Sequence, residues 1–232
     1  MSSDQLSIII PAYNERSTLG QIVYKINKVD IDKVTYEVIV VDDGSSDKTT
    51  EIARNHPGID LFLRHDCNKG KGAAVRTGLR AASGNIFVIQ DADLELNPAD
   101  FPDMIELIIS KGAHVVYGDR LAKQNNQVSH WHYYLGGRIM TVVTNTLFNA
   151  NISDQPVCYK MFTDHAYNSV DLSADGFEFC SEITAQFLLQ EFDIHEVPIE
   201  YNPRSKSNGK KLTPVDGLIG IWTMIKHRFG SQ

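Results

Sequence analysis

Short apolar runs and amphipathic stretches alternate along the first half of the chain. The runs at 6–10 and 36–41 are rich in β-branched residues and end at turn-forming residues, which predicts buried strands. Between them, Leu19, Ile22 and Ile26 recur at the spacing of one helical face. This part of the pattern therefore predicts a strand–helix–strand unit.

The same alternation continues up to residue 117. A helix is predicted at 71–82, and another begins at Asn97-Pro98, runs to Ser110 and is ended by Gly112. The other elements are strands at 60–63, 86–90 and 114–117 and a helix that opens near Ser46 or Asp47. Regular alternation of this kind predicts an α/β fold, a mostly parallel Rossmann-like sheet with helices on both faces.

The second half of the chain has a less regular pattern. Apolar residues dominate 139–148, and the remaining elements are expected as strands at 156–162 and 194–201 and helices at 177–190 and 215–229. Residues 201–213 are polar and basic and predict a mobile loop. No internal repeat or low-complexity linker divides the sequence, so we expect one domain over 1–232.

The charge of the chain is negative and uneven. Its 22 Lys and Arg against 29 Asp and Glu give a net charge of −7 over 232 residues, which argues against a nucleic-acid partner. Residues 1–199 carry 16 basic and 27 acidic side chains, whereas 200–232 carry 6 and 2. The basic tail is therefore where we expect an anionic partner to bind.

Cysteine usage and hydropathy predict the compartment. Cys67, Cys158 and Cys180 are odd in number and widely spaced, which favours reduced thiols over disulfides or a zinc site. The apolar run at 6–12 is too short for a signal peptide, and the sequence lacks a run long enough to span a membrane. We expect a protein of the cytoplasm, either soluble or at the cytoplasmic face of a membrane.

Two carboxylates follow the predicted strand 86–90 directly. Asp91 and Asp93 alternate in extended backbone and can face one point together with Glu95. Such carboxylates repel each other unless a cation intervenes, and Mg²⁺ or Mn²⁺ prefers oxygen ligands of this kind. An Asp-x-Asp sequence is also common in solvated turns, but open α/β sheets bind their ligands at the carboxyl ends of strands.

Two further acidic loops follow strands, at 11–15 and 42–47. A tyrosine ring and carboxylates in these loops suit a nucleoside, although each loop also fits an ordinary turn before a helix. The glycine-rich stretch 68–74 matches neither the dinucleotide-binding fingerprint nor the phosphate-binding loop of nucleoside triphosphatases. Dehydrogenase and ATPase interpretations are therefore disfavoured.

Taken in order, six motifs resemble the family 2 glycosyltransferases of the GT-A fold. They are Pro-Ala-Tyr-Asn-Glu at 11–15, Val-Val-Asp-Asp-Gly-Ser at 40–45, Asn-Lys-Gly-Lys-Gly at 68–72, Asp-Ala-Asp at 91–93, Tyr-Gly-Asp-Arg at 117–120 and Asp154 followed by Cys-Tyr-Lys at 158–160. The resemblance covers nearly the whole chain. Within the family it is strongest to the polyprenyl-phosphate glycosyltransferases, which include the dolichyl-phosphate mannosyltransferases.

The resemblance implies a hexosyltransferase site with these roles. Nucleotide-binding positions would be Pro11, Ala12, Tyr13, Glu15, Asp42, Asp43, Asp91 and Ala92. Asp91, Asp93 and Glu95 would bind Mg²⁺ or Mn²⁺, and Glu95 stands where mannosyltransferases of this type commonly have Gln. The phosphate groups of donor and acceptor would meet Arg120, Arg138, Arg204 and Lys210.

The implied reaction moves a hexose from a nucleotide sugar, GDP-mannose or UDP-glucose in type, to a polyprenyl phosphate such as dolichyl phosphate. Asp93, Asp154 and Arg120 are the catalytic candidates. A phosphate acceptor is already anionic near neutral pH and needs no base, whereas a hydroxyl acceptor does. Asp154 is thus either an orienting group or a base, and in-line displacement predicts inversion.

The sequence leaves open the access of lipid to the site and three alternative functions. The helix at 215–229 is amphipathic and ends in basic residues, so it suits either a membrane interface or the protein core, and the same holds for 139–148. The alternatives to a polyprenyl-phosphate acceptor are a saccharide or protein hydroxyl and, in another class, a nucleotide-sugar-binding module without turnover or a nucleotidyltransferase.

Overall fold

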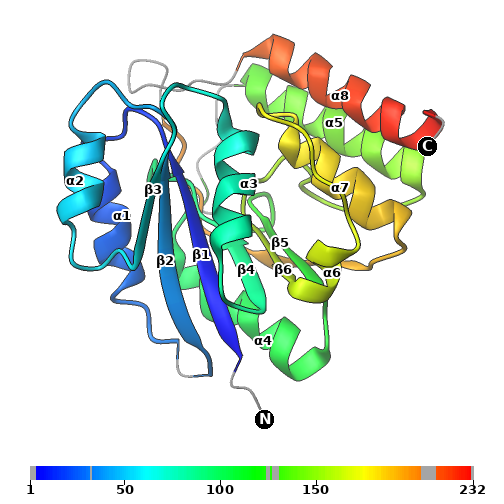
Figure 1. Cartoon of the computed structure of the whole chain (residues 1–232). Coiled ribbons are helices and arrows are strands. Elements are labelled where there is room, and N and C mark those ends of the chain that lie inside the picture. Colours follow the sequence, from blue (N-terminus) through cyan, green and yellow to red (C-terminus); the bar gives the residue numbers. More distant parts are fainter. Residues whose placement is uncertain (1–3, 32, 124–125, 127–130, 205–212, 231–232) are drawn as a thin grey trace.

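A mixed β-sheet forms the centre of the computed structural model, which describes residues 4–31, 33–123, 126, 131–204 and 213–230 (Figure 1). The strands are β1 (Gln5–Ala12), β2 (Thr35–Asp42), β3 (Leu61–Arg64), β4 (Ile86–Ile89), β5 (Val115–Asp119), β6 (Lys160–Thr163) and β7 (Ile194–Pro198). Within the described residues these seven strands are ordered β3-β2-β1-β4-β6-β5-β7.

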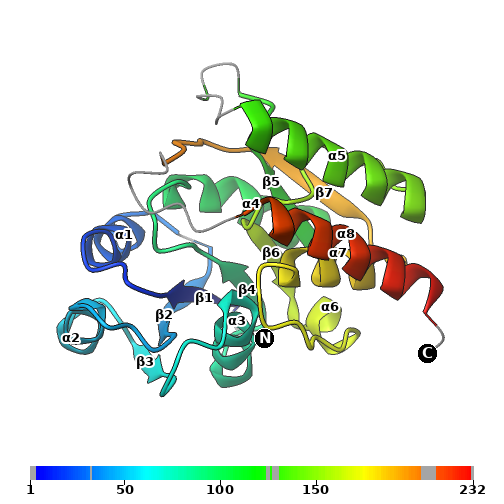
Figure 2. The ribbon, with the colours of Figure 1, turned by 90° about the horizontal axis from the view of Figure 1, so that it is seen from above.

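Helices cover both faces of this sheet. They are α1 (Leu19–Ile26), α2 (Thr49–Asn55), α3 (Lys71–Ala81), α4 (Phe101–Lys111) with the preceding 3₁₀ turn η1 (Pro98–Asp100), α5 (Trp131–Phe148), α6 (Asp164–Asn168), α7 (Phe179–Leu189) and α8 (Pro214–Phe229). Figure 2 shows α1 and α4 on one side and α3 and α7 on the other. The α/β architecture expected from the alternation is confirmed.

Four neighbouring strands, β3, β2, β1 and β4, are parallel, and β2, β1 and β4 are buried over most of their length. Ile8 pairs with Val38 on one side and Val88 on the other, and all three side chains are fully buried. Apolar runs that are continuous rather than alternating fit this environment, because both faces of each strand meet helices. The carboxyl ends of β1, β2 and β4 consequently reach the same edge of the sheet.

The direction of β6 differs from that of the parallel strands. This strand runs antiparallel to both β4 and β5, with Met161 opposite Val88 and Val116. An apolar run is compatible with either direction, so the sequence pattern indicates the strand but not its orientation. Because β6 runs the other way, the segment that precedes it lies at the edge where β4 ends.

Several predicted boundaries were wrong by a few residues. The helix expected to open near Ser46 or Asp47 begins at Thr49, because the Asp47 carboxylate accepts the Thr49 N–H at 2.9 Å and forms a separate turn. The strand expected at 156–162 begins only at Lys160. The C-terminal strand ends at Pro198, before the expected 201.

Two helices differ from the sequence pattern in extent. Helix α5 begins at Trp131, eight residues before the apolar stretch that predicted it, because its first turns carry exposed aromatic residues and two glycines rather than a continuous apolar run. The short helix α6 was not predicted, although Thr163 caps it by accepting the Ala166 N–H. Gly112 ends α4 in the left-handed conformation, at φ 69°, as expected.

Helices α5, α7 and α8 pack together beside the carboxyl edge of the sheet (Figures 1 and 2). Gly220 of α8 allows the close approach, since a Cβ there would lie 2.8 Å from the Ser181 hydroxyl and 3.0 Å from the Met140 methyl group. In the described part of the chain, all helices fall short of the length and apolar character needed to cross a membrane.

A buried lysine lies where β6 meets α7. Lys160 is fully buried, and its Nζ donates to the Gln155 carbonyl at 3.0 Å and to the Thr184 hydroxyl at 3.2 Å. The same ammonium lies 3.5 Å from the centre of the Tyr117 ring. Burial lowers the pKa of Lys160 from 10.5 to about 8, despite the favourable charges nearby.

The pKa of Lys160 predicts how stability depends on pH. Between about pH 8 and 10.5 the folded protein holds Lys160 neutral while the unfolded chain still holds it protonated, so the free energy of unfolding rises with pH. The pKa difference corresponds to about 3 kcal/mol across this window. We expect Lys160→Met to lose this rise in urea unfolding series at successive pH values. An equal slope in both proteins would contradict the assignment.

Candidate active site

A cavity of about 910 Å³ opens at the carboxyl edge of the sheet. Its wall comes from the ends of β1, β2, β4 and β5 and from helices α5 and α8. The predicted site residues that line it are Pro11, Ala12, Tyr13, Glu15, Asp43, Asp91, Ala92, Asp93, Glu95, Arg120, Arg138, Asp154 and Arg204. Segments far apart in sequence thus share one cavity. Lys210 lies outside the described residues.

Each carboxylate of the Asp91-Ala92-Asp93 motif meets a cationic side chain. The Lys71 Nζ forms an ion pair with Asp91, and both side chains are mostly buried. Arg204 donates to Asp93 at 3.0 Å and to the two carboxylate oxygens of Glu15 at 3.1 and 3.2 Å. One guanidinium therefore joins the end of β1 to the end of β4.

Glu95 contacts Arg204 through the Arg204 backbone N–H. Its carboxylate accepts the Arg204 N–H at 3.0 Å, and its own N–H donates to Asp93 at 3.0 Å. Arg204 thus contacts three carboxylates that the sequence assigned to nucleotide or metal binding. These carboxylates, together with Asp91, are called the acidic edge below. They hold in place the segment that leads from β7 to Arg204.

The two aspartates of the motif have pKa values shifted in opposite directions. Burial raises the pKa of Asp93, and the charges of Asp91 and Glu95 raise it further, to about 6, against the opposing effect of Arg204. Burial acts in the same direction at Asp91, but the charge of Lys71 outweighs it and lowers the pKa. The negative charge of the site therefore exceeds the positive charge that Lys71 and Arg204 supply.

This donor set fits a hard divalent cation. In the described ranges, groups of three or more His, Cys, Asp and Glu side chains arranged to hold a metal ion are absent. The carboxylates of Asp91 and Asp93 nevertheless offer the oxygen ligands that Mg²⁺ and Mn²⁺ prefer, and burial together with the charges of Asp91 and Glu95, which such a cation would offset, raises the pKa of Asp93. Arg204 would have to leave Asp93 for that carboxylate to serve as a ligand.

Asp42 and Asp43 occupy different environments although they are adjacent. Asp42 is fully buried beneath the cavity, where it accepts the Ser45 N–H at 3.0 Å and the Thr50 hydroxyl and lies 3.4 Å from the Arg64 Nε. Asp43 lines the cavity. Asp42 therefore orders the turn after β2, whereas Asp43 is the one placed to meet a ligand.

Asp43 also fixes the glycine-rich segment after β3. Its carboxylate accepts the N–H groups of Lys69 and Gly70 at 2.9 and 2.8 Å and the His65 Nδ1 at 2.7 Å. Gly70 has φ 104°, and a Cβ there would lie 2.3 Å from the Asp175 carbonyl oxygen, so a larger residue does not fit. The loop is thereby held so that Lys71 points at Asp91.

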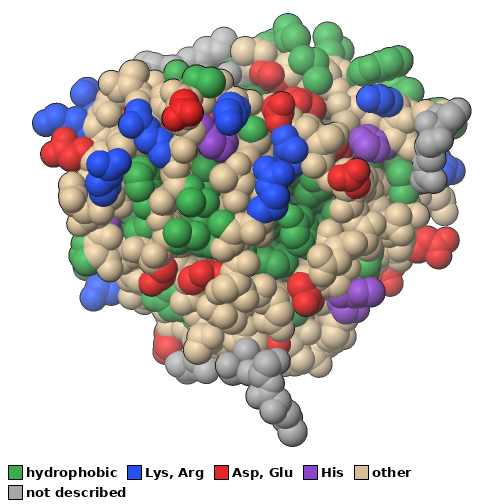
Figure 3. Space-filling model, viewed as in Figure 1, with side chains coloured by type: hydrophobic (Ala, Val, Ile, Leu, Met, Phe, Trp, Pro, Cys, Tyr) green, Lys and Arg blue, Asp and Glu red, His purple; other side chains and the backbone are tan. Residues whose placement is uncertain are grey.

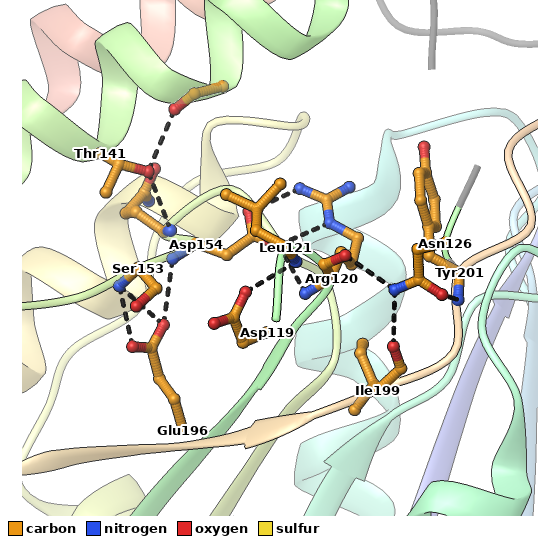
Figure 4. A network of polar contacts seen from close by, with 12 residues as sticks. Asp119, Arg120, Leu121, Asn126, Thr141, Ser153, Asp154, Glu196, Ile199 and Tyr201 are labelled. Carbon is orange, nitrogen blue, oxygen red and sulfur yellow. Dashed lines mark hydrogen bonds and ion pairs between the residues drawn. The ribbon is translucent and has the colours of Figure 1, made fainter. Parts of the chain in front are cut away.

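Arg120 and Asp154 form a two-pronged ion pair in the cavity wall (Figure 4). The Arg120 Nε and Nη2 donate to the two Asp154 oxygens at 2.7 and 2.8 Å, and the Arg120 backbone N–H donates to Oδ2 at 3.2 Å. Burial alone would raise the pKa of Asp154, but the Arg120 charge and hydrogen bonds lower it below its ordinary value.

Neighbouring residues hold this pair in one orientation. Glu196 of β7 accepts the N–H groups of Ser153 and Asp154 at 2.8 to 3.0 Å, and Asn126 donates to the Arg120 carbonyl at 2.7 Å (Figure 4). The Tyr201 ring centre lies 5.1 Å from the Arg120 guanidinium carbon. The guanidinium is thus held by Asp154 and Tyr201, while Asn126 and Glu196 hold the backbone on either side of the ion pair.

The opposite wall of the cavity is largely apolar. Helix α5 contributes Tyr134 and Ile139, and α8 contributes Leu218 and Ile221. Arg138 also lies here, with its Nη1 donating to the Ser153 carbonyl at 3.3 Å. Acidic and basic groups therefore line the end of the cavity at the strand ends, whereas the end at α5 and α8 is mainly apolar, with Arg138 and Asp216 among its side chains.

Large apolar side chains continue from this wall onto the outer surface of α5 and α8, where Figure 3 shows them gathered. The exposed ones are Trp131, Tyr134, Leu135, Ile139, Val142, Val215, Leu218, Ile219, Trp222 and Phe229, called the α5/α8 face below. The sequence left open whether these stretches belong to the core or to a surface. The structure places core and surface positions on each helix, since Thr144 of α5 and Met224 of α8 are fully buried.

Sequence reasoning missed three residues that shape the site. Lys71 was seen only as part of a glycine-rich stretch, and Glu196 had no motif around it. Cys158 was assigned to a family motif, but its contact with the Lys71 Nζ at 2.9 Å was not foreseen. A lysine at the first turn of a helix that follows a flexible loop is a weak signal, because such residues are usually solvated.

Comparisons with known proteins agree with this geometry. The chain is 28% identical over 201 residues to the low-salt glycan biosynthesis hexosyltransferase Agl6 of Haloferax volcanii, covering 86% of this chain and 48% of that protein. It is 30% identical over 214 residues to the dolichol-phosphate mannosyltransferase of Pyrococcus furiosus, covering 89% of this chain and 59% of that protein. The chain thus spans about half of the length of these relatives.

A solved structure and a family model complete the comparison. Glucosyl-3-phosphoglycerate synthase from Mycobacterium tuberculosis, in complex with Mn²⁺, UDP and phosphoglyceric acid, matches with a TM-score of 0.75 at 19% identity, covering 100% of this chain and 81% of that one. This likeness confirms the expected GT-A fold. The family model Glycosyl transferase family 2 matches residues 7–170. The chain therefore belongs to glycosyl transferase family 2.

Proposed function

We propose that this protein transfers a hexose from a nucleotide sugar to a polyprenyl phosphate, with inversion at the anomeric carbon and with help from a divalent cation. One observation carries the proposal: a single cavity joins the acidic edge and the Arg120–Asp154 pair to the apolar wall of α5 and α8. The donor is charged at one end, and the proposed acceptor combines a phosphate with a hydrocarbon chain.

Relatives support both halves of the proposal. One relative is named as a dolichol-phosphate mannosyltransferase, and dolichol phosphate is a polyprenyl phosphate. The other relative is named as a hexosyltransferase. Structures of the mycobacterial neighbour contain UDP with Mn²⁺ or Mg²⁺. For this chain the nucleotide would bind along Pro11, Ala12, Tyr13 and Asp43, next to Asp91.

The cation would be held by Asp93 together with Asp91 and Glu95. A divalent cation bound there supplies charge that stabilises the departing diphosphate. Among the residues of the chain, Arg204 moves first, because its guanidinium occupies the Asp93 and Glu15 oxygens. Once released, Arg204 can donate to phosphate oxygens from the same side of the cavity, while Lys71 keeps Asp91 ionised and oriented.

The state of Asp154 favours a phosphate acceptor over a hydroxyl. Both of its oxygens accept from Arg120, and its pKa is lowered, so it is a poor base. A phosphate monoester carries its own negative charge and needs positive groups rather than a base. Arg120 supplies a fixed positive charge, and Arg138 supplies a second on the way to the apolar wall.

We further propose that the α5/α8 face meets the membrane that carries the lipid acceptor. Leu218 and Trp222 are 68% and 64% exposed on α8, and the last turn of this helix carries Lys226, His227 and Arg228. Apolar side chains beside basic ones suit a bilayer interface with anionic headgroups. Contact of this face with lipid would bring the acceptor phosphate to the mouth of the cavity.

A transfer assay tests the proposed reaction. With Mn²⁺, labelled GDP-mannose or UDP-glucose and a short polyprenyl phosphate, we expect label to move into the organic phase. Asp93→Asn should lower the rate at least about 100-fold, whereas Asp103→Asn, which removes an exposed carboxylate from α4, should leave it unchanged. Label in a water-soluble glycoside would favour a hydroxyl acceptor, and nucleotide binding without any transfer would favour a binding module.

The role of Asp154 is tested separately. Asp154→Asn keeps an oxygen acceptor for Arg120, so we expect transfer to fall by less than about tenfold, with an unchanged pH profile between pH 6 and 8. A general base would contribute about 100-fold or more. A loss of that size, with an acidic limb removed from the pH profile of kcat/KM, would contradict the orienting role.

Vesicle binding tests the α5/α8 face. In sedimentation with vesicles that contain anionic phospholipid, we expect Leu218→Ser and Trp222→Ser each to weaken binding about tenfold, because each removes apolar area from the interface. Tyr24→Ser provides the matched control, since Tyr24 is 61% exposed on α1. Equal losses in all three variants, or no binding by the unmodified chain, would contradict membrane contact.

A further inference from the structure

Two cysteine thiols meet in the wall of the cavity. The Cys158 Sγ lies 3.7 Å from the Cys180 Sγ, and neither sulfur is part of a disulfide. Cys158 lies just before β6, and Cys180 belongs to the first turn of α7. The third cysteine of the chain, Cys67, is exposed. The proposed reaction uses neither thiol of the pair.

Buried hydrogen bonds hold the two segments together. The Gln155 side-chain amide donates to the Cys180 carbonyl at 3.2 Å. Lys160 links the same two segments by donating to the Gln155 carbonyl and to Thr184 of α7. The proximity of the thiols is therefore built into the core and does not depend on exposed side chains.

The pair is accessible to a small reagent and lies next to a cation. Both Cys158 and Cys180 line the cavity of about 910 Å³. The Lys71 Nζ lies 2.9 Å from the Cys158 Sγ, so the pair adjoins a mostly buried ammonium group.

We propose that Cys158 and Cys180 form an oxidation-sensitive dithiol that takes peroxides as its reagent and closes to a disulfide. One thiolate attacks a peroxide oxygen, the O–O bond breaks, and hydroxide leaves and takes up that thiol's proton as water. The second thiolate then attacks the resulting sulfenic sulfur, the S–O bond breaks, and a second water leaves. Two thiols and one hydrogen peroxide thus give one disulfide and two waters.

Disulfide formation changes the acidic edge through Lys71. The two sulfur atoms must approach from 3.7 Å to about 2.0 Å, and the Cys158 sulfur then no longer offers a thiol or thiolate to Lys71. The Lys71 Nζ is shared between this sulfur and Asp91. Oxidation therefore alters the placement of Asp91, and, given the proposed function, it lowers the affinity for the nucleotide.

Peroxide treatment of the full chain tests the dithiol directly. After graded hydrogen peroxide, we expect the unmodified chain and Cys67→Ser to lose two thiols each and the mass of two hydrogen atoms, with peptide mapping that joins Cys158 to Cys180. Cys158→Ser and Cys180→Ser should form no such crosslink. Affinity for UDP or GDP, measured by calorimetry, should fall about tenfold on oxidation and recover with dithiothreitol in the unmodified chain and in Cys67→Ser.

Three results would overturn the proposal, and each one bears on a different step of it. Survival of both thiols at peroxide concentrations that oxidise Cys67 would exclude the dithiol reaction. A crosslink that includes Cys67 would show that a different pair reacts. A crosslink between Cys158 and Cys180 that leaves nucleotide affinity unchanged would exclude the coupling through Lys71. If the reduced chain binds neither UDP nor GDP, the proposed function fails, while the crosslink still decides the dithiol chemistry.

Discussion

Charge compensation at the carboxyl edge of the sheet is the interaction on which the site depends. The ends of β1 and β4 bring Glu15, Asp91 and Asp93 into one cavity, where their mutual repulsion would be costly without positive partners. Lys71 and Arg204 provide those partners from elements far along the chain. The same negative charge that requires them in the free protein suits the edge to a divalent cation and a nucleotide.

The two halves of the cavity have complementary chemistry. The proposed sites for a cation and a nucleoside lie at the acidic edge, and the Arg120–Asp154 ion pair holds an oriented guanidinium beyond it. From there the wall becomes apolar along α5 and α8, and the α5/α8 face continues it to the surface. A substrate that combines a phosphate with a long hydrocarbon fits this gradient better than a saccharide does, because a saccharide would leave the apolar wall unused.

The sequence predicts the fold well wherever local patterns decide it. Buried β-branched runs predict the parallel strands, and the position of Asp91 and Asp93 after one of them predicts the edge where they lie. Pairings between distant residues are not encoded in such patterns, so the partners Lys71, Arg120 and Arg204 emerge only in the folded chain. The antiparallel direction of β6 was missed for the same reason, since an apolar run fits a sheet in either direction.

In the proposed mechanism, Arg204 occupies the position on the acidic edge that a divalent cation would take. The most direct test is Mn²⁺ affinity in the absence of nucleotide, measured by electron paramagnetic resonance. Arg204→Gln should bind Mn²⁺ about tenfold more tightly than the unmodified chain, because it removes a competing cation from Asp93 and Glu15. Arg138→Gln, which removes a cavity charge that donates to a backbone carbonyl, should have a much smaller effect. Equal or weaker Mn²⁺ binding by Arg204→Gln would contradict competition between Arg204 and the divalent cation.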